Sequence, residues 1–539
     1  MTTVGQLIVE TLAAHQIDRV FCVPGESYLG LLDAFYGRSD VDLVVCRQEA
    51  GAGFMALADA RLTGRPGVAM VSRVPGASNA AISVHTAQQD AVPFILFIGQ
   101  VAAQDVRRDS FQEIDYGHMF GKIAKWTAEV TSPERMAETL LRAVHMATTG
   151  LPGPVVIAIP EDVLTSDCAT QAVLPQARPA AAPDAASVEK VRALLSSAQR
   201  PLVLAGSGID TPAARVQLLA FLEAWNVPSI VSFRCQDLLP NAHPLYAGDM
   251  GLSNPDSQMA ALQECDLLLC AGARLSDITT QNYTYPRLVR PQMTFIHIHS
   301  DPGVIGTHFA CDVALACHPS IALAAIGEPD FSLPDRTNWI RQLSGEHRKI
   351  TAVCDIVPSD GVSFETVVEL VGQYLPKDAI VSVDAGTFGA PVYRVVSFAP
   401  PQRLLAPISG AMGFGVPAAV AACLREPDRT VVCFVGDGGF LMTGSELAVA
   451  LERKLSLKII LSENGMYASI RIQQERQFPG RNIGTSFANP DFELMAKAYG
   501  FPVTQISNAF QLGLIPDLLR SPSPEFIVVR SSVEAVLPR

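Results

Sequence analysis

The sequence lacks the patterns that mark zinc-binding, nucleic acid-binding and membrane-spanning proteins. Its eleven cysteines include no Cys-x-x-Cys pair, which argues against a zinc site and favours reduced thiols in a cytoplasm. A net charge of −13 argues against nucleic acid as a partner. The longest apolar stretch, around residues 411–424, contains glycine and proline and stops short of a membrane span. Residues 1–16 lack a basic start followed by an apolar block, so we expect no signal peptide.

Charged residues are scarce. They make up 17% of the 539 residues, against 49% hydrophobic residues, so we expect well-buried domains with large subunit interfaces. A proline- and alanine-rich stretch at 174–186 and a charged, proline-bearing passage at 328–360 read as connections between domains. They delimit domains at 1–170, 187–328 and 360–539. Helical and strand patterns alternate within them, which predicts an α/β protein of three doubly wound, parallel-sheet domains with sites at the carboxyl ends of strands.

Residues 429–467 carry the densest chemical signal. An apolar, β-branched run at 431–435 predicts a buried parallel strand that opens into Gly436-Asp437-Gly438-Gly439. A second apolar run, 457–461, brings Asn464 to the same edge of the sheet. Glycines let backbone N–H groups approach an anion, and a carboxylate with an amide oxygen suits Mg²⁺, which bridges to phosphates. A tight turn between strand and helix would explain the glycines about as well.

The spacing of this motif resembles the thiamine diphosphate signature of the enzyme family that includes acetolactate synthase, pyruvate decarboxylase and benzoylformate decarboxylase. The family usually has two successive asparagines, and here the first is Glu463. The resemblance implies that a Mg²⁺ ion is held by Asp437, Asn464 and Met466. It also implies contacts with the cofactor from four residues of this motif: Gly438, Gly439, Met466 and Tyr467.

Two earlier segments extend the resemblance through the C-terminal domain. The strand and turn that end in Gly386, Thr387 and Phe388 are similar to the family's diphosphate contact. The run PISGAMGFGV at 407–416 resembles the loop in which a bulky residue wedges beneath thiamine and bends its two rings into a V. Met412 occupies that position, although a methionine in an apolar run is usually a core residue.

Glu49 is the candidate catalytic acid. On its own it reads as a solvated acid at a helix start, stabilised by the helix dipole. However, residues 47–70 are similar to the family segment that carries the catalytic glutamate. That resemblance implies a carboxyl hydrogen-bonded to the pyrimidine nitrogen, which lets the cofactor's own amino group deprotonate the thiazolium carbon. The following Pro75–Asn79 segment predicts a turn.

The segment Asp109-Ser110-Phe111-Gln112-Glu113 narrows the resemblance to the acetolactate synthase branch. It implies that Phe111 and Gln112 line the substrate pocket and take part in catalysis, and that Lys125 lies near the same pocket. Simpler interpretations remain open: Phe111 could be a core residue, Gln112 a loop cap and Lys125 a surface charge.

Two further residues are substrate candidates by resemblance. Arg274 matches an arginine near the acceptor carboxylate, where a guanidinium would bind a 2-oxo acid with two parallel hydrogen bonds, although a structural ion pair is equally compatible. Gln473 stands where the branch uses a tryptophan that favours a larger acceptor. This departure indicates that the pocket has a different shape.

The flavin cofactor of some relatives is left open by the sequence. Gly206 and Gly208 follow a strand as in a weak dinucleotide pattern, which a tight turn also explains. Asp301 lies in a stretch that resembles the one after the flavin cleft. The neighbouring Gly-Met-His-Gly of those relatives is replaced by Gly248-Asp249-Met250-Gly251. FAD is therefore possible but not required by the sequence.

Together these features predict a thiamine diphosphate- and Mg²⁺-dependent enzyme that decarboxylates a 2-oxo acid and ligates the remainder to a second carbonyl. Formation of 2-acetolactate from two pyruvates is the leading example. The alternative is a decarboxylase or carbon–carbon lyase that releases an aldehyde, and a cofactor-binding subunit without catalysis is a third hypothesis. The resemblance implies that Glu49 of one subunit serves the cofactor of another, in a homodimer or homotetramer.

Overall fold

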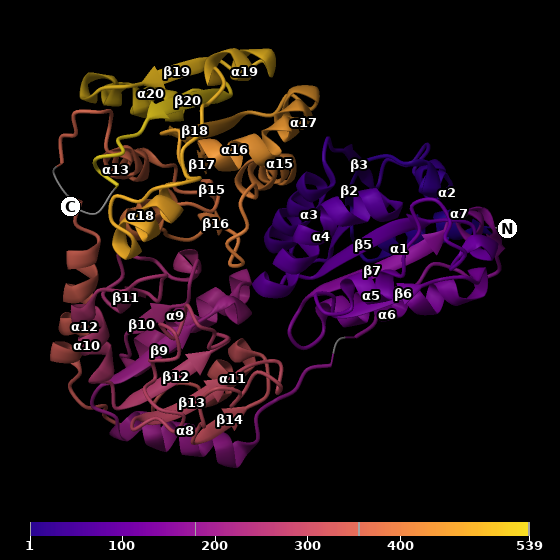
Figure 1. Cartoon of the computed structure of the whole chain (residues 1–539). Helices are drawn as coiled ribbons and strands as arrows, with labels where there is room; N and C mark the ends of the chain where they lie inside the picture. Colours follow the sequence, from indigo (N-terminus) through magenta and orange to yellow (C-terminus); the bar gives the residue numbers. More distant parts are fainter. Residues whose placement is uncertain (1, 178, 354–355, 537–539) are drawn as a thin grey trace.

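The computed structural model describes residues 2–177, 179–353 and 356–536, which form three six-stranded parallel sheets (Figure 1). Figure 1 shows the sheets in three lobes that follow one another along the chain, each flanked by helices. A short antiparallel pair, β1 (Thr2–Thr3) with β8 (Asp167–Cys168), joins the two ends of the first lobe. The predicted α/β class with three doubly wound parallel sheets is confirmed.

The first sheet has the strand order β3-β2-β4-β5-β7-β6. Its strands are β2 (Arg19–Cys22), β3 (Asp42–Val45), β4 (Gly67–Ser72), β5 (Phe94–Gln100), β6 (Trp126–Glu129) and β7 (Pro154–Pro160). Its helices are α1 (Val4–Ala14), α2 (Leu29–Asp33), α3 (Glu49–Thr63), α4 (Arg73–Asp90), α5 (Tyr116–Phe120), α6 (Met136–Thr148) and α7 (Glu161–Thr165). The central strands β5 and β7 are buried along their whole length, as expected for parallel strands covered on both faces.

The second sheet has the order β11-β10-β9-β12-β13-β14. Its strands are β9 (Pro201–Ala205), β10 (Ser229–Val231), β11 (Tyr246–Asp249), β12 (Leu267–Ala271), β13 (Thr294–Ile298) and β14 (Val313–Leu315). Its helices are α8 (Ala185–Ser197), α9 (Pro212–Trp225), α10 (Asp256–Gln263), α11 (Pro319–Ile326) and α12 (Thr337–Ile350). Helix α12 lies in the passage that the sequence presents as a connection, and it packs there because Trp339 and Leu343, one turn apart, are both buried.

The third sheet has the order β16-β15-β17-β18-β20-β19. Its strands are β15 (Ile380–Val383), β16 (Arg403–Leu405), β17 (Val431–Gly436), β18 (Leu457–Glu463), β19 (Val503–Ile506) and β20 (Glu525–Arg530). Its helices are α13 (Phe364–Tyr374), α14 (Gly389–Val395), α15 (Gly415–Arg425), α16 (Asp437–Thr443), α17 (Leu447–Glu452), α18 (Ala468–Gln477), α19 (Phe492–Ala498) and α20 (Ile515–Arg520). Strands β17 and β18 are neighbours in register, so the segments that follow them emerge at one edge of the sheet.

Helices α3 and α15 join the first lobe to the third. Both are rich in alanine and glycine, which allows their backbones to approach closely. The rings of Phe54 and Phe414 meet edge to face across this contact, with centroids 5.6 Å apart. The two lobes therefore share one continuous hydrophobic core.

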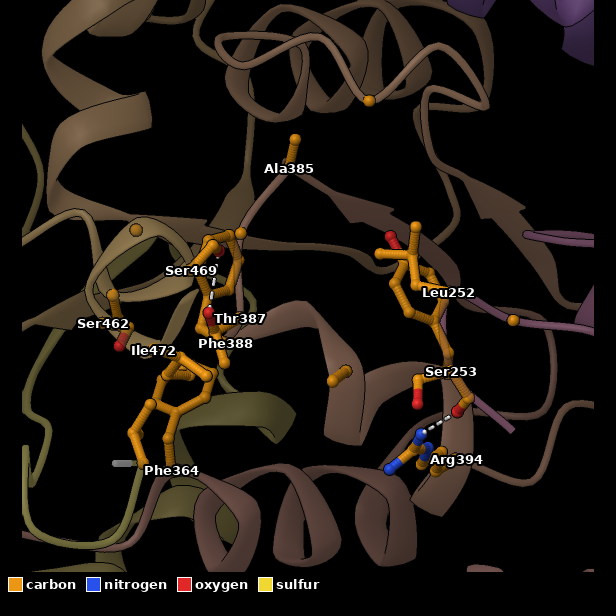
Figure 2. Close-up of a pocket in the computed structure, with 18 of the residues that line it drawn as sticks. Leu252, Ser253, Phe364, Ala385, Thr387, Phe388, Arg394, Ser462, Ser469 and Ile472 are labelled. Carbon is orange, nitrogen blue, oxygen red and sulfur yellow. Dashed lines mark hydrogen bonds between the residues drawn. The ribbon is translucent and has the colours of Figure 1, made fainter. Parts of the chain in front are cut away.

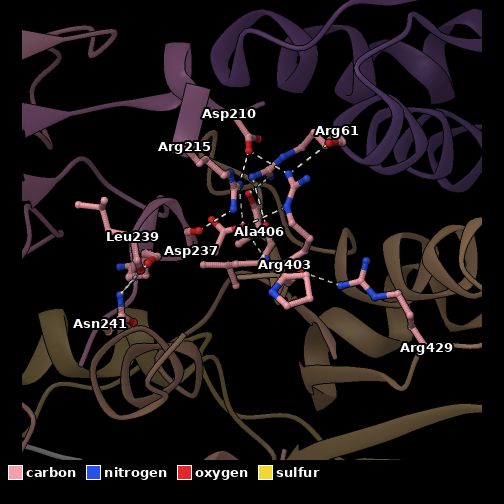
Figure 3. A network of polar contacts seen from close by, with 12 residues as sticks. Arg61, Asp210, Arg215, Asp237, Leu239, Asn241, Arg403, Ala406 and Arg429 are labelled. Atoms are coloured by element: carbon pink, nitrogen blue, oxygen red, sulfur yellow. Dashed lines mark hydrogen bonds and ion pairs between the residues drawn. The ribbon is translucent and has the colours of Figure 1, made fainter. Parts of the chain in front are cut away.

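A buried network of charged groups connects all three lobes (Figure 3). Arg403 of the third lobe pairs with Asp210 at 2.9 Å and with Asp237 at 3.2 Å, both in the second lobe. Arg215 pairs with the same two carboxylates. From the first lobe, Arg61 donates to backbone carbonyl groups beside Arg403. Because these groups are desolvated and mutually paired, removal of one partner would leave a buried charge uncompensated.

The predicted turn at Pro75–Asn79 is wrong, because these residues belong to α4, which begins at Arg73. Pro75 is tolerated there since the first turn of a helix has no internal partner for its N–H groups. Across the described ranges, no helix is both long enough and apolar enough to span a membrane.

Candidate functional site

A cavity of about 560 Å³ lies where the carboxyl ends of β15, β17 and β18 face loops of the second lobe. Figure 2 shows two walls of this cavity, one bearing Thr387, Phe388 and Ser469 and the other bearing Leu252, Ser253 and Arg394. Eleven of the residues predicted from the sequence line it: Gly386, Thr387, Phe388, Met412, Asp437, Gly438, Gly439, Asn464, Met466, Tyr467 and Gln473. The fold thus gathers in one place several segments that are separated in the chain, as parallel-sheet topology dictates.

Asp437 is the centre of the polar end of the cavity. Its Oδ2 accepts hydrogen bonds from the backbone N–H of Asn464 at 2.9 Å and of Gly465 at 2.7 Å. Its Oδ1 accepts from the N–H of Gly438 at 2.8 Å. The side-chain amide of Asn489 also donates to Oδ2, at 2.9 Å. These bonds hold the carboxylate that follows β17 against the turn that follows β18.

The oxygen atoms around Asp437 fit a hard divalent cation. The carboxylate, the Asn464 side-chain oxygen and nearby backbone carbonyls are the ligand types that Mg²⁺ takes when phosphate and water complete its shell. The side-chain oxygen of Asn489 is buried without a hydrogen-bond partner among the described residues. Among the residues that the structure describes, no group of three or more His, Cys, Asp and Glu could hold a metal ion. A cation here would therefore need amide, carbonyl and phosphate oxygens in addition to the Asp437 carboxylate.

Glu463 stands where the family usually has an asparagine, and it lies beside this polar centre. Burial and the nearby Asp437 carboxylate raise the pKa of Glu463. Glu463 and Asp437 each disfavour ionisation of the other, and a bound cation would stabilise the ionised form of both.

The two glycines after Asp437 pack so closely against their neighbours that a side chain at either position would collide with them. A Cβ on Gly438 would lie 2.7 Å from the Tyr467 ring, and one on Gly439 would lie 3.0 Å from a carboxylate oxygen of Asp384. On the wall of the cavity that bears both residues, the hydroxyl groups of Thr387 and Ser469 form a hydrogen bond of 2.8 Å. Close backbone approach with hydroxyl groups nearby is the arrangement that a diphosphate requires.

The loop that carries Met412 is held by a buried carboxylate that the sequence analysis did not assign. Asp384 accepts from the backbone N–H groups of Gly413 and Gly415, each at 2.9 Å. Burial raises the pKa of Asp384 to about 6, although these hydrogen bonds oppose the shift. At the base of the loop, Asp90 of the first lobe accepts from the N–H of Ser409 at 2.8 Å. Asp384 could have been noticed as an acid at a strand end, whereas Asp90 has no comparable signal.

Glu49 does not line this cavity. It is the first residue of α3, partly exposed, and its Oε2 accepts a hydrogen bond of 2.8 Å from the Asn79 side chain. The two residues before Glu49, Arg47 and Gln48, donate their backbone N–H groups to the buried carboxyl of Glu446, at 3.1 and 2.9 Å. Glu446 was also missed by the sequence analysis, because it reaches the first lobe from the third.

The remaining four candidates also lie outside the cavity. Phe111 is 76% exposed, and Gln112 is exposed with a left-handed backbone (φ 61°). The Lys125 ammonium donates to the carbonyl oxygens of Thr149 and of Leu151, the latter at 2.9 Å.

Arg274 lies at a second cavity, of about 320 Å³, between the first and second lobes. Its guanidinium donates to the backbone carbonyls of Gln88 and Gln89. A half-buried arginine in this position links two lobes, and within one chain it does not line the cavity at Asp437.

The glycines of the weak dinucleotide pattern are explained by packing. A Cβ on Gly206 would lie 2.3 Å from Cα of Ala273, and one on Gly208 would lie 2.9 Å from Cα of Gly272. Close backbone packing therefore accounts for these two glycines without a nucleotide.

Comparison with known proteins agrees with this site. Profiles of the thiamine pyrophosphate enzymes match residues 2–119 (N-terminal TPP binding domain), 188–326 (central domain) and 384–527 (C-terminal TPP binding domain). The chain is 31% identical to acetolactate synthase isozyme 1 large subunit of Escherichia coli, over 99% of this chain and 94% of that protein. It is 30% identical to the isozyme 2 large subunit of the same organism, over 97% and 95%. It is 29% identical to the acetolactate synthase large subunit of Lactococcus lactis, over 100% and 94%. The chain therefore belongs to the thiamine pyrophosphate-dependent, acetolactate synthase-like enzymes.

Proposed function

We propose that this enzyme converts two pyruvate anions and one proton into 2-acetolactate and CO₂, with thiamine diphosphate and Mg²⁺. The observation that carries the proposal is the single cavity in which the Asp437 centre, the glycine turns and the Met412 loop meet. The names of the relatives support the same reaction. When bound, thiamine diphosphate would supply a nucleophilic thiazolium carbon and a positively charged ring that takes up the electron pair released with CO₂.

The chain's own residues would bind and orient this group. Asp437 and Asn464 would hold Mg²⁺, with Met466 contributing its backbone carbonyl, and the ion would offset the negative charge of the diphosphate. Thr387 and the glycine turns would contact the diphosphate oxygens. Met412 would support the bent rings, because its loop is anchored through two hydrogen bonds to Asp384.

We further propose that the active site is completed by a second copy of the chain, in a homodimer or homotetramer. Glu49 would hold and transfer the proton at the pyrimidine nitrogen of the cofactor bound by the other copy, since it does not line the cavity of its own chain. Phe111 and Gln112 would enter the same composite site, which gives a reason for an exposed phenylalanine. Lys125 and Arg274, which donate to carbonyl groups of their own chain, are less suited to that role.

We also propose a cytoplasmic location, because all ten cysteines in the described ranges are free thiols.

The test is incubation of purified protein with thiamine diphosphate, Mg²⁺ and pyruvate, with and without FAD, followed by mass spectrometry of the products. We expect 2-acetolactate, formed equally with and without FAD. Acetaldehyde with CO₂ would reassign the enzyme as a decarboxylase. A Glu49→Gln variant should bind cofactor but lose most proton exchange at the thiazolium carbon, and normal exchange would remove Glu49 from the mechanism.

A further inference from the structure

The loop that carries Met412 is fixed on its C-terminal side by the third lobe, to which it belongs. Asp384 accepts from the N–H groups of Gly413 and Gly415, and the Thr443 hydroxyl donates to the Gly413 carbonyl at 2.6 Å. Gly413 has a φ of 84°, a left-handed conformation that glycine adopts without strain. Because Gly413 directly follows Met412, this side of the loop has little freedom to move.

The N-terminal side of the loop is held by the other two lobes. Asp90, the last residue of α4 in the first lobe, accepts from the N–H of Ser409 at 2.8 Å. Thr86, one turn earlier on α4, forms a hydroxyl–hydroxyl hydrogen bond of 3.2 Å with the Ser409 side chain. Arg234 of the second lobe donates to the carbonyl of Pro407. The first lobe therefore holds the loop at Ser409, through both its backbone and its side chain.

Asp90 is a buried carboxyl, only 5% exposed, whose hydrogen-bond donors belong to another lobe. Burial raises the pKa of Asp90, whereas the charge of Arg61 opposes this rise. Hydrogen bonds from the N–H groups of Ser409 and Ile408 also favour the ionised carboxylate. A carboxyl without such donors would be costly to bury. Since both donors are backbone groups of the Met412 loop, the carboxyl and the loop hold each other in place.

The part of the loop between these two sets of contacts is short. It consists of Gly410, Ala411 and Met412, and the Met412 side chain is half-buried and lines the cofactor cavity. A span of three residues with both ends fixed has few alternative backbone conformations. The position of Met412 therefore depends on Asp90 as much as on Asp384.

We propose that Asp90 is a positioning residue for the cofactor, because through Ser409 it sets the place of Met412 beneath the two rings of thiamine diphosphate. This inference rests on the proposed function, in which Met412 supports the bent rings. The bend keeps the cofactor's amino group beside the thiazolium carbon whose proton it removes, and such a transfer depends steeply on the distance between the two groups. Asp90 itself touches neither cofactor nor substrate and acts through the loop.

The test compares Asp90→Ala and Asp90→Asn with the wild type, in the full-length enzyme with Mg²⁺. The first readout is the Kd for thiamine diphosphate from a fluorescence titration. The second is the rate of hydrogen–deuterium exchange at the thiazolium carbon with saturating cofactor, measured by acid quench and NMR. Asp59→Asn is the matched control, because Asp59 is also a buried first-lobe carboxyl that binds the third lobe, but through Arg425 of α15, at 2.8 Å.

We expect Asp90→Ala to raise the Kd about tenfold and to slow the exchange about tenfold even with saturating cofactor. Asp90→Asn keeps one acceptor oxygen for the Ser409 N–H, so it should slow the exchange about threefold. The control should lower the urea midpoint of unfolding and leave the exchange rate unchanged.

An exchange rate equal to that of the wild type in Asp90→Ala would overturn the positioning role while leaving the proposed function intact. Equal slowing in the Asp59→Asn control would do the same, because the effect would then come from docking of the lobes in general. If Asp90→Ala does not fold, Asp90→Asn decides the question by the same comparison. A wild-type enzyme that shows no exchange of the bound cofactor would contradict the proposed function itself.

Discussion

Glu446 gives the sharpest prediction about how the lobes meet. Its carboxyl is fully buried, and burial raises its pKa from the usual 4.5 to about 7, although hydrogen bonds from the Arg47 and Gln48 backbone oppose this. A difference of this size corresponds to about 3 kcal/mol between the two protonation states. The buried carboxyl is therefore stabilising when protonated and costly when ionised.

The sign of the pH dependence follows from the two pKa values. The folded protein, with the higher pKa, binds this proton more tightly than the unfolded chain does. The stability that Glu446 contributes is complete below pH 4.5 and is lost as the pH rises through 7. Glu446→Gln has no proton to lose, so it should match the wild type near pH 4.5 and exceed its free energy of unfolding by about 3 kcal/mol at pH 8.

The assay is urea unfolding of wild type and variant at pH 5 and pH 8, in which the difference between the two proteins cancels the other titrating groups. Glu452→Gln is the control, because Glu452 is a half-exposed carboxylate that pairs with the Arg47 guanidinium at 2.8 Å. It should cost about 0 to 1 kcal/mol at either pH. If Glu446→Gln lowered stability equally at both pH values, the carboxyl would be ionised throughout and the reasoning would be refuted.

Three further predictions concern the Met412 loop, the second lobe and the exposed aromatic residue. Asp384→Asn should weaken thiamine diphosphate binding about tenfold, measured by fluorescence titration, because it weakens two charge-assisted hydrogen bonds to the Met412 loop; unchanged affinity would contradict this. Gly206→Ala should lower the free energy of unfolding by about 1 to 3 kcal/mol in urea, since its Cβ would overlap Ala273. Phe111→Ala should change stability by less than about 0.5 kcal/mol yet raise KM for pyruvate, and an unchanged KM would exclude it from the site.

The fold class and the core of the site were predictable because their signals are local. Apolar, β-branched runs such as 431–435 and 457–461 predict buried parallel strands, and the residues that follow two neighbouring strands of this kind meet at one sheet edge. Asp437 and Asn464 are placed together by this rule alone. The turn predicted at Pro75–Asn79 was wrong because proline is as acceptable in the first turn of a helix as in a loop.

Other parts of the site depend on contacts between residues far apart in the chain. Glu446 contacts Gln48, 398 positions away in the chain, and Asp384 contacts Gly413, 29 positions away. Nothing in the local sequence of Asn489 or Gln236 distinguishes them from surface residues. Only the packed structure shows that Gln236 is buried in a cavity wall and that the Asn489 amide donates to Asp437.

The sequence by itself determined the three parallel-sheet domains, the family and eleven of the residues that line the cavity, because strand periodicity and strand-end motifs are encoded within short segments. Only the tertiary structure decided which arginines line the cavity, which carboxyls hold the Met412 and Glu49 segments, and which candidates lie outside. Burial, pairing and pKa depend on the packing of all three lobes, and no short segment contains that information.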